Sequence, residues 1–177
     1  EASTKPLASP RPPEGGVARR GDRGVRAFLV RPETNASIRA VSRLLAAGMR
    51  VSRATEPMAV EGVHHPPGTY VVESPQGLDD AISTVAREES LAFEALGSPP
   101  LAPLARLRLP RVGSYQSYAP TAEEGWARFV FEEYRVPYAT IHDRDVRQGG
   151  LGQRFDAVLL PHQPPAQIAD GQSTAEY

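Results

Sequence analysis

The sequence predicts an α/β protein built from two small units, the second of them an incomplete doubly wound parallel sheet. Short apolar runs alternate with helical patterns along most of the chain, and a stretch rich in proline divides these elements into two sets. After the last apolar run the residues are polar, so the second sheet lacks its later strands. We therefore expect a flexible linker at 1–24, a first unit at 25–96, a proline-rich linker at 97–110 and a second unit at 111–177.

Composition restricts the classes of function. The 177 residues carry a net charge of −1, which lacks the basic excess expected of proteins that bind nucleic acids or anionic membranes. Cysteine is absent, which excludes disulfides, thiolate zinc sites and cysteine nucleophiles. No apolar run approaches the roughly 20 residues that a membrane-spanning helix needs. We expect no nucleic-acid partner and no membrane span.

The first unit opens with a strand, a helix and a strand joined by short connections. Asn35 is the expected helix cap, Val41 and Leu44 recur at helical spacing, and Gly48 lies where a left-handed residue ends many helices. This order is typical of a βαβ unit in a parallel sheet. The remaining elements are predicted as a hairpin at 58–65, a strand at 69–72, a helix at 77–88 and a strand at 91–96.

The second unit is predicted to contain three strands and one clear helix. Thr121 and Glu124 form a capping-box pattern that starts the helix. Trp126, Phe129 and Val130 lie on one helical stripe, so we expect them to pack against the sheet. The strands are expected at 111–115, 138–141 and 155–161, the last of them nearly all apolar and therefore buried on both faces.

The face of this sheet opposite the helix is expected to lack a cover. Val158 and Leu160 would then be exposed, and exposed apolar surface invites association. We expect a dimer or a docked partner at this face.

Polar side chains follow each strand of the second unit. Open α/β sheets bind ligands outside the carboxyl ends of their strands. The sequence therefore predicts weak ligand-binding candidates there, but spacing alone assembles no Ser–His–acid set, so no catalytic residue is assigned. The candidates are Ser114, Tyr115 and Gln116 after the first strand, His142 and Asp143 after the second, and His162 after the third.

Four short motifs of the second unit carry a resemblance to a known family: Glu124-Gly125-Trp126, Pro137-Tyr138, Asp145-Val146-Arg147 and Leu160-Pro161. Through them, residues 111–171 resemble the carboxy-terminal region of bacterial zinc carboxypeptidase-like proteins of the carboxypeptidase A type. That region is similar to a class I glutamine amidotransferase-like or flavodoxin-like fold. Residues 25–96 resemble the segment that precedes it in the family.

The resemblance places the zinc peptidase chemistry outside this chain. The family holds its metal with a His-x-x-Glu pair and a distant histidine, and none of the four histidines here is followed three residues later by glutamate. The adjacent His64 and His65 would point to opposite faces of a strand, which does not suit a shared metal. The resemblance therefore implies no cofactor and no metal in this chain, zinc only in the missing catalytic domain of the parent protein, and a secreted or periplasmic location for that parent.

These observations lead to two main hypotheses. In the first, the chain is a non-catalytic accessory module of a zinc carboxypeptidase-like hydrolase, with a structural or partner-binding role. Its partner would be the catalytic domain of the parent chain or a second copy of itself. In the alternative, the chain is a small-molecule-binding α/β domain that uses the carboxyl ends of its parallel strands. A less favoured hypothesis is a hydrolase completed by residues beyond Tyr177.

Overall fold

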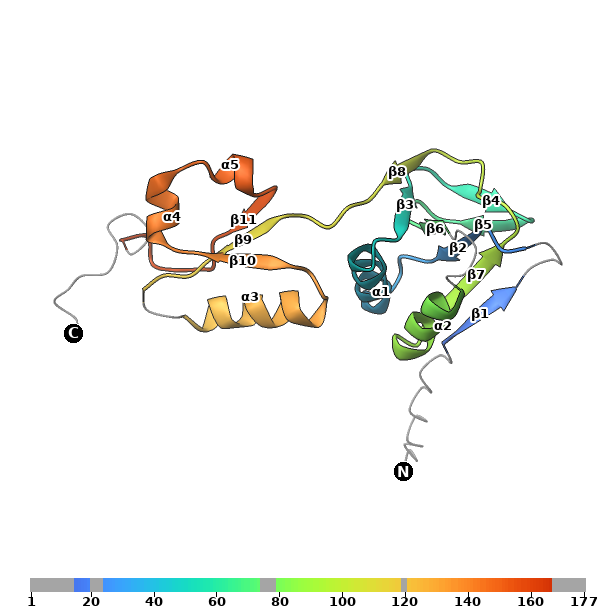
Figure 1. Cartoon of the computed structure of the whole chain (residues 1–177), viewed down its shortest axis with the longest axis horizontal. Coiled ribbons are helices and arrows are strands. Elements are labelled where there is room, and N and C mark those ends of the chain that lie inside the picture. The colour runs from blue at the N-terminus through green and yellow to red at the C-terminus, as the bar shows by residue number, and fades with distance from the viewer. Residues whose placement is uncertain (1–14, 20–23, 74–78, 119–120, 167–177) are drawn as a thin grey trace, which may run out of the picture. The chain divides into compact units, whose positions relative to one another are not determined.

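The computed structural model describes residues 15–19, 24–73, 79–118 and 121–166. The chain divides into two compact units, Glu1–Leu107 and Arg108–Tyr177, each with its own sheet (Figure 1). The fold is a mixed α/β fold. The strands predicted at 27–30 and 155–161 belong to different sheets.

The first unit contains a mixed sheet of six strands in the order β1-β7-β2-β6-β3-β8. β1 runs parallel to β7, and all other neighbours are antiparallel. The prediction of a parallel sheet is wrong here, because β6 lies between β2 and β3 and pairs with both. The strands are β1 (Gly16–Arg19), β2 (Ala27–Val30), β3 (Arg50–Ala54), β6 (Tyr70–Glu73), β7 (Ala92–Leu96) and β8 (Leu104–Arg106).

Both faces of this sheet are covered. The helices α1 (Asn35–Ala46) and α2 (Asp79–Glu88) lie over one face, where Phe28, Leu44, Ile82 and Phe93 form the largest part of the core. A hairpin of β4 (Met58–Val60) and β5 (Val63–His65), which confirms the hairpin prediction, brings Met58 onto the other face. The central order β7-β2-β6-β3 with two helices on one side is the split β-α-β arrangement of ferredoxin-like folds.

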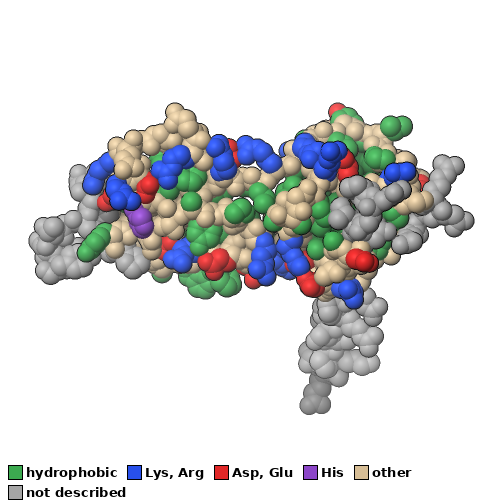
Figure 2. All heavy atoms as spheres, viewed as in Figure 1, with side chains coloured by type: hydrophobic (Ala, Val, Ile, Leu, Met, Phe, Trp, Pro, Cys, Tyr) green, Lys and Arg blue, Asp and Glu red, His purple; other side chains and the backbone are tan. Residues whose placement is uncertain are grey.

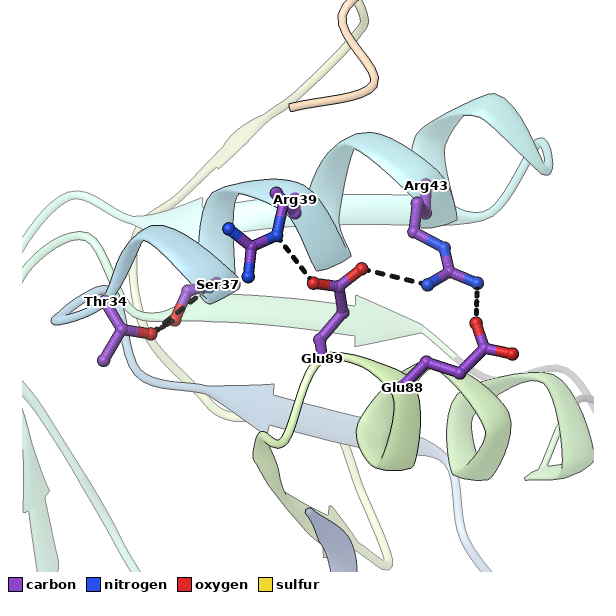
Figure 3. Close-up of polar contacts among 6 residues, drawn as sticks. All are labelled: Thr34, Ser37, Arg39, Arg43, Glu88 and Glu89. Atoms are coloured by element: carbon purple, nitrogen blue, oxygen red, sulfur yellow. Dashed lines mark hydrogen bonds and ion pairs between the residues drawn. The ribbon is translucent and has the colours of Figure 1, made fainter. Parts of the chain in front are cut away.

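The helix α1 is held at its start and along its side by polar contacts (Figure 3). Its cap is Thr34, whose side chain accepts a hydrogen bond from the Ser37 amide, and not Asn35 as predicted. On the flank, Arg39 and Arg43 both bind the carboxylate of Glu89, at 2.8 and 2.9 Å. These contacts join α1 to the end of α2. Gly48 has φ of 77°, which confirms the left-handed residue predicted after the helix.

Parts of both predicted linkers belong to the first sheet. β1 falls inside the segment 1–24 and pairs with β7, whereas β8 falls inside 97–110 and pairs with β3. Neither strand was predicted, because each is short and its sequence is rich in arginine, glycine or small residues. Backbone pairing at the edges of an existing sheet orders them.

The second unit contains three parallel strands in the order β10-β9-β11, which confirms the predicted parallel pairing. The strands are β9 (Val112–Tyr115), β10 (Tyr138–Ile141) and β11 (Ala157–Leu159). The helix α3 (Ala122–Glu133) connects β9 to β10 and packs against β9. Two short helices that the sequence did not suggest, α4 (Asp143–Gln148) and α5 (Leu151–Arg154), connect β10 to β11.

The orientation predicted for α3 is wrong. Trp126, Phe129 and Val130 point away from the sheet and are 67%, 55% and 48% exposed, and the buried residue of the helix is Glu124. The helix has a second apolar stripe, Ala127 and Phe131, which is half-buried, and the Phe131 ring packs against Tyr138 of β10 with ring centroids 5.3 Å apart. Both stripes satisfy the same periodicity, so the sequence pattern could not decide between them.

The prediction that the last strand is buried on both faces is also wrong. β11 is an edge strand, and Ala157, Val158 and Leu159 are all exposed. The expectation that Val158 and Leu160 lack a cover is confirmed, since both remain exposed. The apolar character of β11 therefore does not reflect burial within the described residues.

Candidate functional site

The six predicted site residues lie along one edge of the second sheet. Ser114 is in register with Thr140 of β10 and with Leu159 of β11, so the three parallel strands end close together. Ser114 and Tyr115 are the last two residues of β9 and Gln116 follows them, His142 and Asp143 follow β10, and His162 comes after β11.

Tyr115 and Asp143 form a short side-chain hydrogen bond at this edge. The phenol of Tyr115 donates to Asp143 Oδ1 at 2.5 Å. Burial, and next the hydrogen bond to this carboxylate, raise the pKa of Tyr115 to about 12, because both disfavour the phenolate. At neutral pH Tyr115 is therefore a neutral phenol, which is unsuited to act as a base.

His142 is oriented by the backbone of the neighbouring strand end. Its Nδ1 lies 3.0 Å from the carbonyl oxygen of Gln116, whose own amide donates to the Ile141 carbonyl at 2.9 Å. A carbonyl can only accept, so Nδ1 carries the proton. In the neutral ring Nε2 is then a hydrogen-bond acceptor on an exposed side chain. The ring is thus prepared to accept one hydrogen bond from a ligand.

The remaining two candidates are placed differently. Ser114 is fully buried, and its Oγ has no hydrogen-bond partner among the described residues. His162 is exposed, and within the described part of the chain no hydrogen bond joins it to the other five. The structure therefore brings together Tyr115 with Asp143 and Gln116 with His142, but it forms no Ser–His–acid arrangement.

Two buried polar residues of this unit were not predicted as site residues. Glu124 and Gln163 are each 4% exposed, and Glu124 Oε1 and Gln163 Nε2 lack a hydrogen-bond partner among the described residues. Glu124 was interpreted only as part of a capping box, and its amide does donate to Thr121 Oγ1 at 3.2 Å. In the sequence, Glu124 precedes Ala127 by three residues, so both lie on the same stripe of the helix. This spacing is the signal that could have predicted the burial of Glu124.

Ser114 and Glu124 lie in the same layer, between the sheet and α3. Tyr138 reaches α3, since its hydroxyl binds Arg128 and Glu132. Side chains of paired residues in parallel strands point to the same face, and the direction alternates along each strand. Tyr138 is paired with Val112, so Ser114, two residues further on, also points toward α3. Glu124 is in the first turn of α3, which begins at this same edge (Figure 1).

The opposite, amino edge of the sheet carries a cluster of a different kind. Asp156 accepts from Arg108 at 2.5 and 3.0 Å, from the Arg111 guanidinium at 2.9 Å and from the Arg111 amide at 2.9 Å. The two guanidinium groups hold the pKa of Asp156 well below its usual range. Asp156 accepts these hydrogen bonds from Arg108 and Arg111 of the same unit. The cluster therefore anchors the start of β9 to the start of β11.

The described residues limit the other kinds of site. Within them no three His, Asp or Glu side chains are placed to hold a metal ion, and no helix is long and apolar enough to cross a bilayer. A cavity of about 330 Å³ lies in the first unit, beside Gly16, Val17, Phe28 and Arg87. Comparison of the chain with family models, with curated proteins and with solved structures gives no match.

Proposed function

We propose that this chain is a non-catalytic accessory module of a zinc carboxypeptidase-like protein and that it joins two copies of that protein through α3. The second unit would be part of a flavodoxin-like or amidotransferase-like doubly wound domain. The observation that carries the proposal is the apolar outer face of α3, formed by Trp126, Phe129 and Val130. Hydrophobic side chains gather on the surface over this helix (Figure 2).

The outer face of α3 has the composition of an interface. Trp126 and Phe129 contact each other edge to face, with ring centroids 5.9 Å apart, so they present a preformed aromatic surface. Aromatic residues are enriched at the centres of protein interfaces, and contiguous exposed apolar patches mark such sites. If these rings contacted only water, a large apolar area would be exposed on a small unit.

A second copy of the chain is the occupant that the charges around this face favour. Glu123 lies in the first turn of α3, and Arg135 lies just beyond its last turn. A two-fold axis at the middle of the helix would pack α3 antiparallel on its copy, so that Glu123 of one protomer approaches Arg135 of the other. The helix dipoles are then also antiparallel, which is favourable.

The oligomeric state tests this function. Size-exclusion chromatography with light scattering on the whole chain is expected to give a dimer, and Trp126→Ser is expected to give a monomer with unchanged circular dichroism. Leu101→Ser is the matched control, because Leu101 is a fully exposed apolar residue of the first unit. A chain that is monomeric at about 100 μM, roughly ten times a typical weak-dimer Kd, would reject self-association and leave the parent's catalytic domain as the partner.

A second function is favoured by a separate observation, the buried polar atoms at the carboxyl edge. Ser114, Glu124 and Gln163 each bury an atom without a hydrogen-bond partner among the described residues. Ligands of open α/β sheets bind at this edge. Under this proposal the chain is a small-molecule-binding domain. Ligand-induced shifts of amide NMR signals near Ser114, absent from the first unit, would support it.

A further inference from the structure

We propose that the carboxyl edge of the second sheet binds the backbone end of an α-amino acid, with its ammonium group at Glu124 and Ser114 and its carboxylate at Gln163. This inference rests on the second function above, small-molecule binding, and names the class of ligand. It is independent of the dimer proposed for α3, which uses the outer face of the helix.

The first argument is energetic. A polar atom that is removed from water without a hydrogen-bond partner destabilises the fold, and native proteins keep only a few such atoms per 100 residues. The 57 described residues of the second unit, 108–118 and 121–166, bury three such side-chain atoms: Ser114 Oγ, Glu124 Oε1 and Gln163 Nε2. Polar atoms arranged in this way are suited to a polar guest.

The second argument is the placement of the three residues. Ser114 is the penultimate residue of the central strand and points toward α3, Glu124 occupies the first turn of that helix, and Gln163 follows the edge strand by four residues. All three therefore come from the carboxyl edge of the sheet. Their atoms lie below the surface, so a ligand reaches them only with a small terminal group, and the rest of the ligand would remain at the exposed rim near His142.

The third argument is the pattern of donors and acceptors. Glu124 Oε1 is an acceptor, Ser114 Oγ is both donor and acceptor, and Gln163 Nε2 is a donor. Glu124 Oε1 forms an ion pair with Arg128 Nε at 3.8 Å, which is longer than a hydrogen bond, and Arg128 Nε also donates to the Tyr138 hydroxyl. A ligand that matches this set offers a cationic donor to Glu124 and an acceptor to Gln163. The ammonium and carboxylate of an α-amino acid provide both within one small group.

The experiment is an NMR titration of the whole, uniformly labelled chain with L-alanine. We expect saturable shifts of the amide signals around Ser114, Glu124 and Gln163, with half-saturation below about 10 mM. Glu124→Gln keeps the shape of the side chain but removes its charge, and it should weaken binding at least about tenfold. Ser114→Ala should weaken it in the same direction. Glu133→Gln, an exposed glutamate near the other end of the same helix, is the matched control and should leave the affinity within roughly twofold.

Three other probes separate this inference from its alternatives. Ethylammonium and acetate each carry half of the proposed recognition group, and acetamide carries an uncharged donor and acceptor. The inference is overturned if L-alanine gives no saturable shift, if Glu124→Gln binds as well as the parent chain, or if ethylammonium alone binds as tightly as L-alanine. Saturable shifts of the same signals with acetamide but not with L-alanine would retain the site and reject the amino-acid class. If none of the probes gives a saturable shift, both this inference and the proposed small-molecule-binding function are rejected. The proposed dimer is tested separately, by light scattering.

Discussion

The hydroxyl of Tyr115 and the carboxylate of Asp143 join the ends of two neighbouring parallel strands by a hydrogen bond of 2.5 Å. Tyr115 belongs to the central strand β9, and Asp143 is the first residue of α4, directly after β10. The backbone register already places Tyr115 opposite Ile141. The side-chain contact extends that pairing by two residues and fixes the start of α4 at the candidate site.

Asp143→Asn is expected to lower the pKa of Tyr115 from about 12 toward its ordinary value near 10. Burial remains in the variant, so the return should be partial. The raised pKa stabilises the fold fully below about pH 10, and this contribution is lost as the pH rises toward 12. The measurement is the titration of the tyrosine Cζ signal by NMR. Asp80→Asn, an exposed carboxylate of the first unit, should leave it unchanged.

Glu89→Gln is expected to destabilise the first unit by about 2 kcal/mol, because it removes the carboxylate to which Arg39 and Arg43 donate at 2.8 and 2.9 Å. Burial acts to raise the pKa of Glu89, but hydrogen bonds from the two arginines lower it overall. The stabilisation should therefore be present above the ordinary carboxyl pKa of about 4.3 and fade at more acidic pH. Urea denaturation at neutral pH measures the difference. Glu88→Gln is the control, since Glu88 is more exposed and contacts only Arg43; an equal loss in both variants would contradict this prediction.

Trp126→Ala is expected to change the stability of the monomer by less than about 1 kcal/mol, because two thirds of the side chain is exposed. Ile141→Ala should instead cost about 2–5 kcal/mol, since Ile141 is fully buried in the same unit. Denaturation at a protein concentration low enough to keep the chain monomeric checks both. A loss of about 3 kcal/mol in Trp126→Ala would mean that the side chain is packed within the unit after all.

Asp156→Asn is expected to destabilise the second unit at neutral pH, because two guanidinium groups lose their common carboxylate. The lowered pKa of Asp156 means that its contribution is present above about pH 4 and is lost as the pH falls below that value. The difference in stability between the variant and the parent chain should therefore narrow in acid. Thermal unfolding followed at pH 7 and near pH 2.5 tests this, and a difference that persists undiminished in acid would refute it.

The isolated chain is expected to release no carboxy-terminal residues from peptides and to bind zinc no better than weakly. The reason is chemical: the sequence has no cysteine and no His-x-x-Glu pair. Incubation of a synthetic peptide with the purified chain and zinc, followed by mass spectrometry, provides the measurement. Peptide trimming that a chelator abolishes would show that the chain has its own metal chemistry.

Local patterns were sufficient to predict most elements of the chain. The hairpin at 58–65, the left-handed Gly48 and the three parallel strands of the second unit were predicted from turn residues, apolar runs and helix signals. Each of these depends on the conformational preferences of a few consecutive residues, so the sequence determines it without reference to the rest of the chain. The same holds for the place of the candidate residues after the strands.

Only the tertiary structure decided which surfaces meet. β6 separates β2 from β3, and Phe131 rather than Trp126 contacts the sheet, through the ring of Tyr138, although either arrangement satisfies the local pattern. Strand order and helix orientation depend on contacts between residues far apart in the chain, and periodicity contains no information about the partner. For the same reason the sequence placed Glu124 in a helix cap, while its burial beside the strand of Ser114 appears only when sheet and helix are packed together.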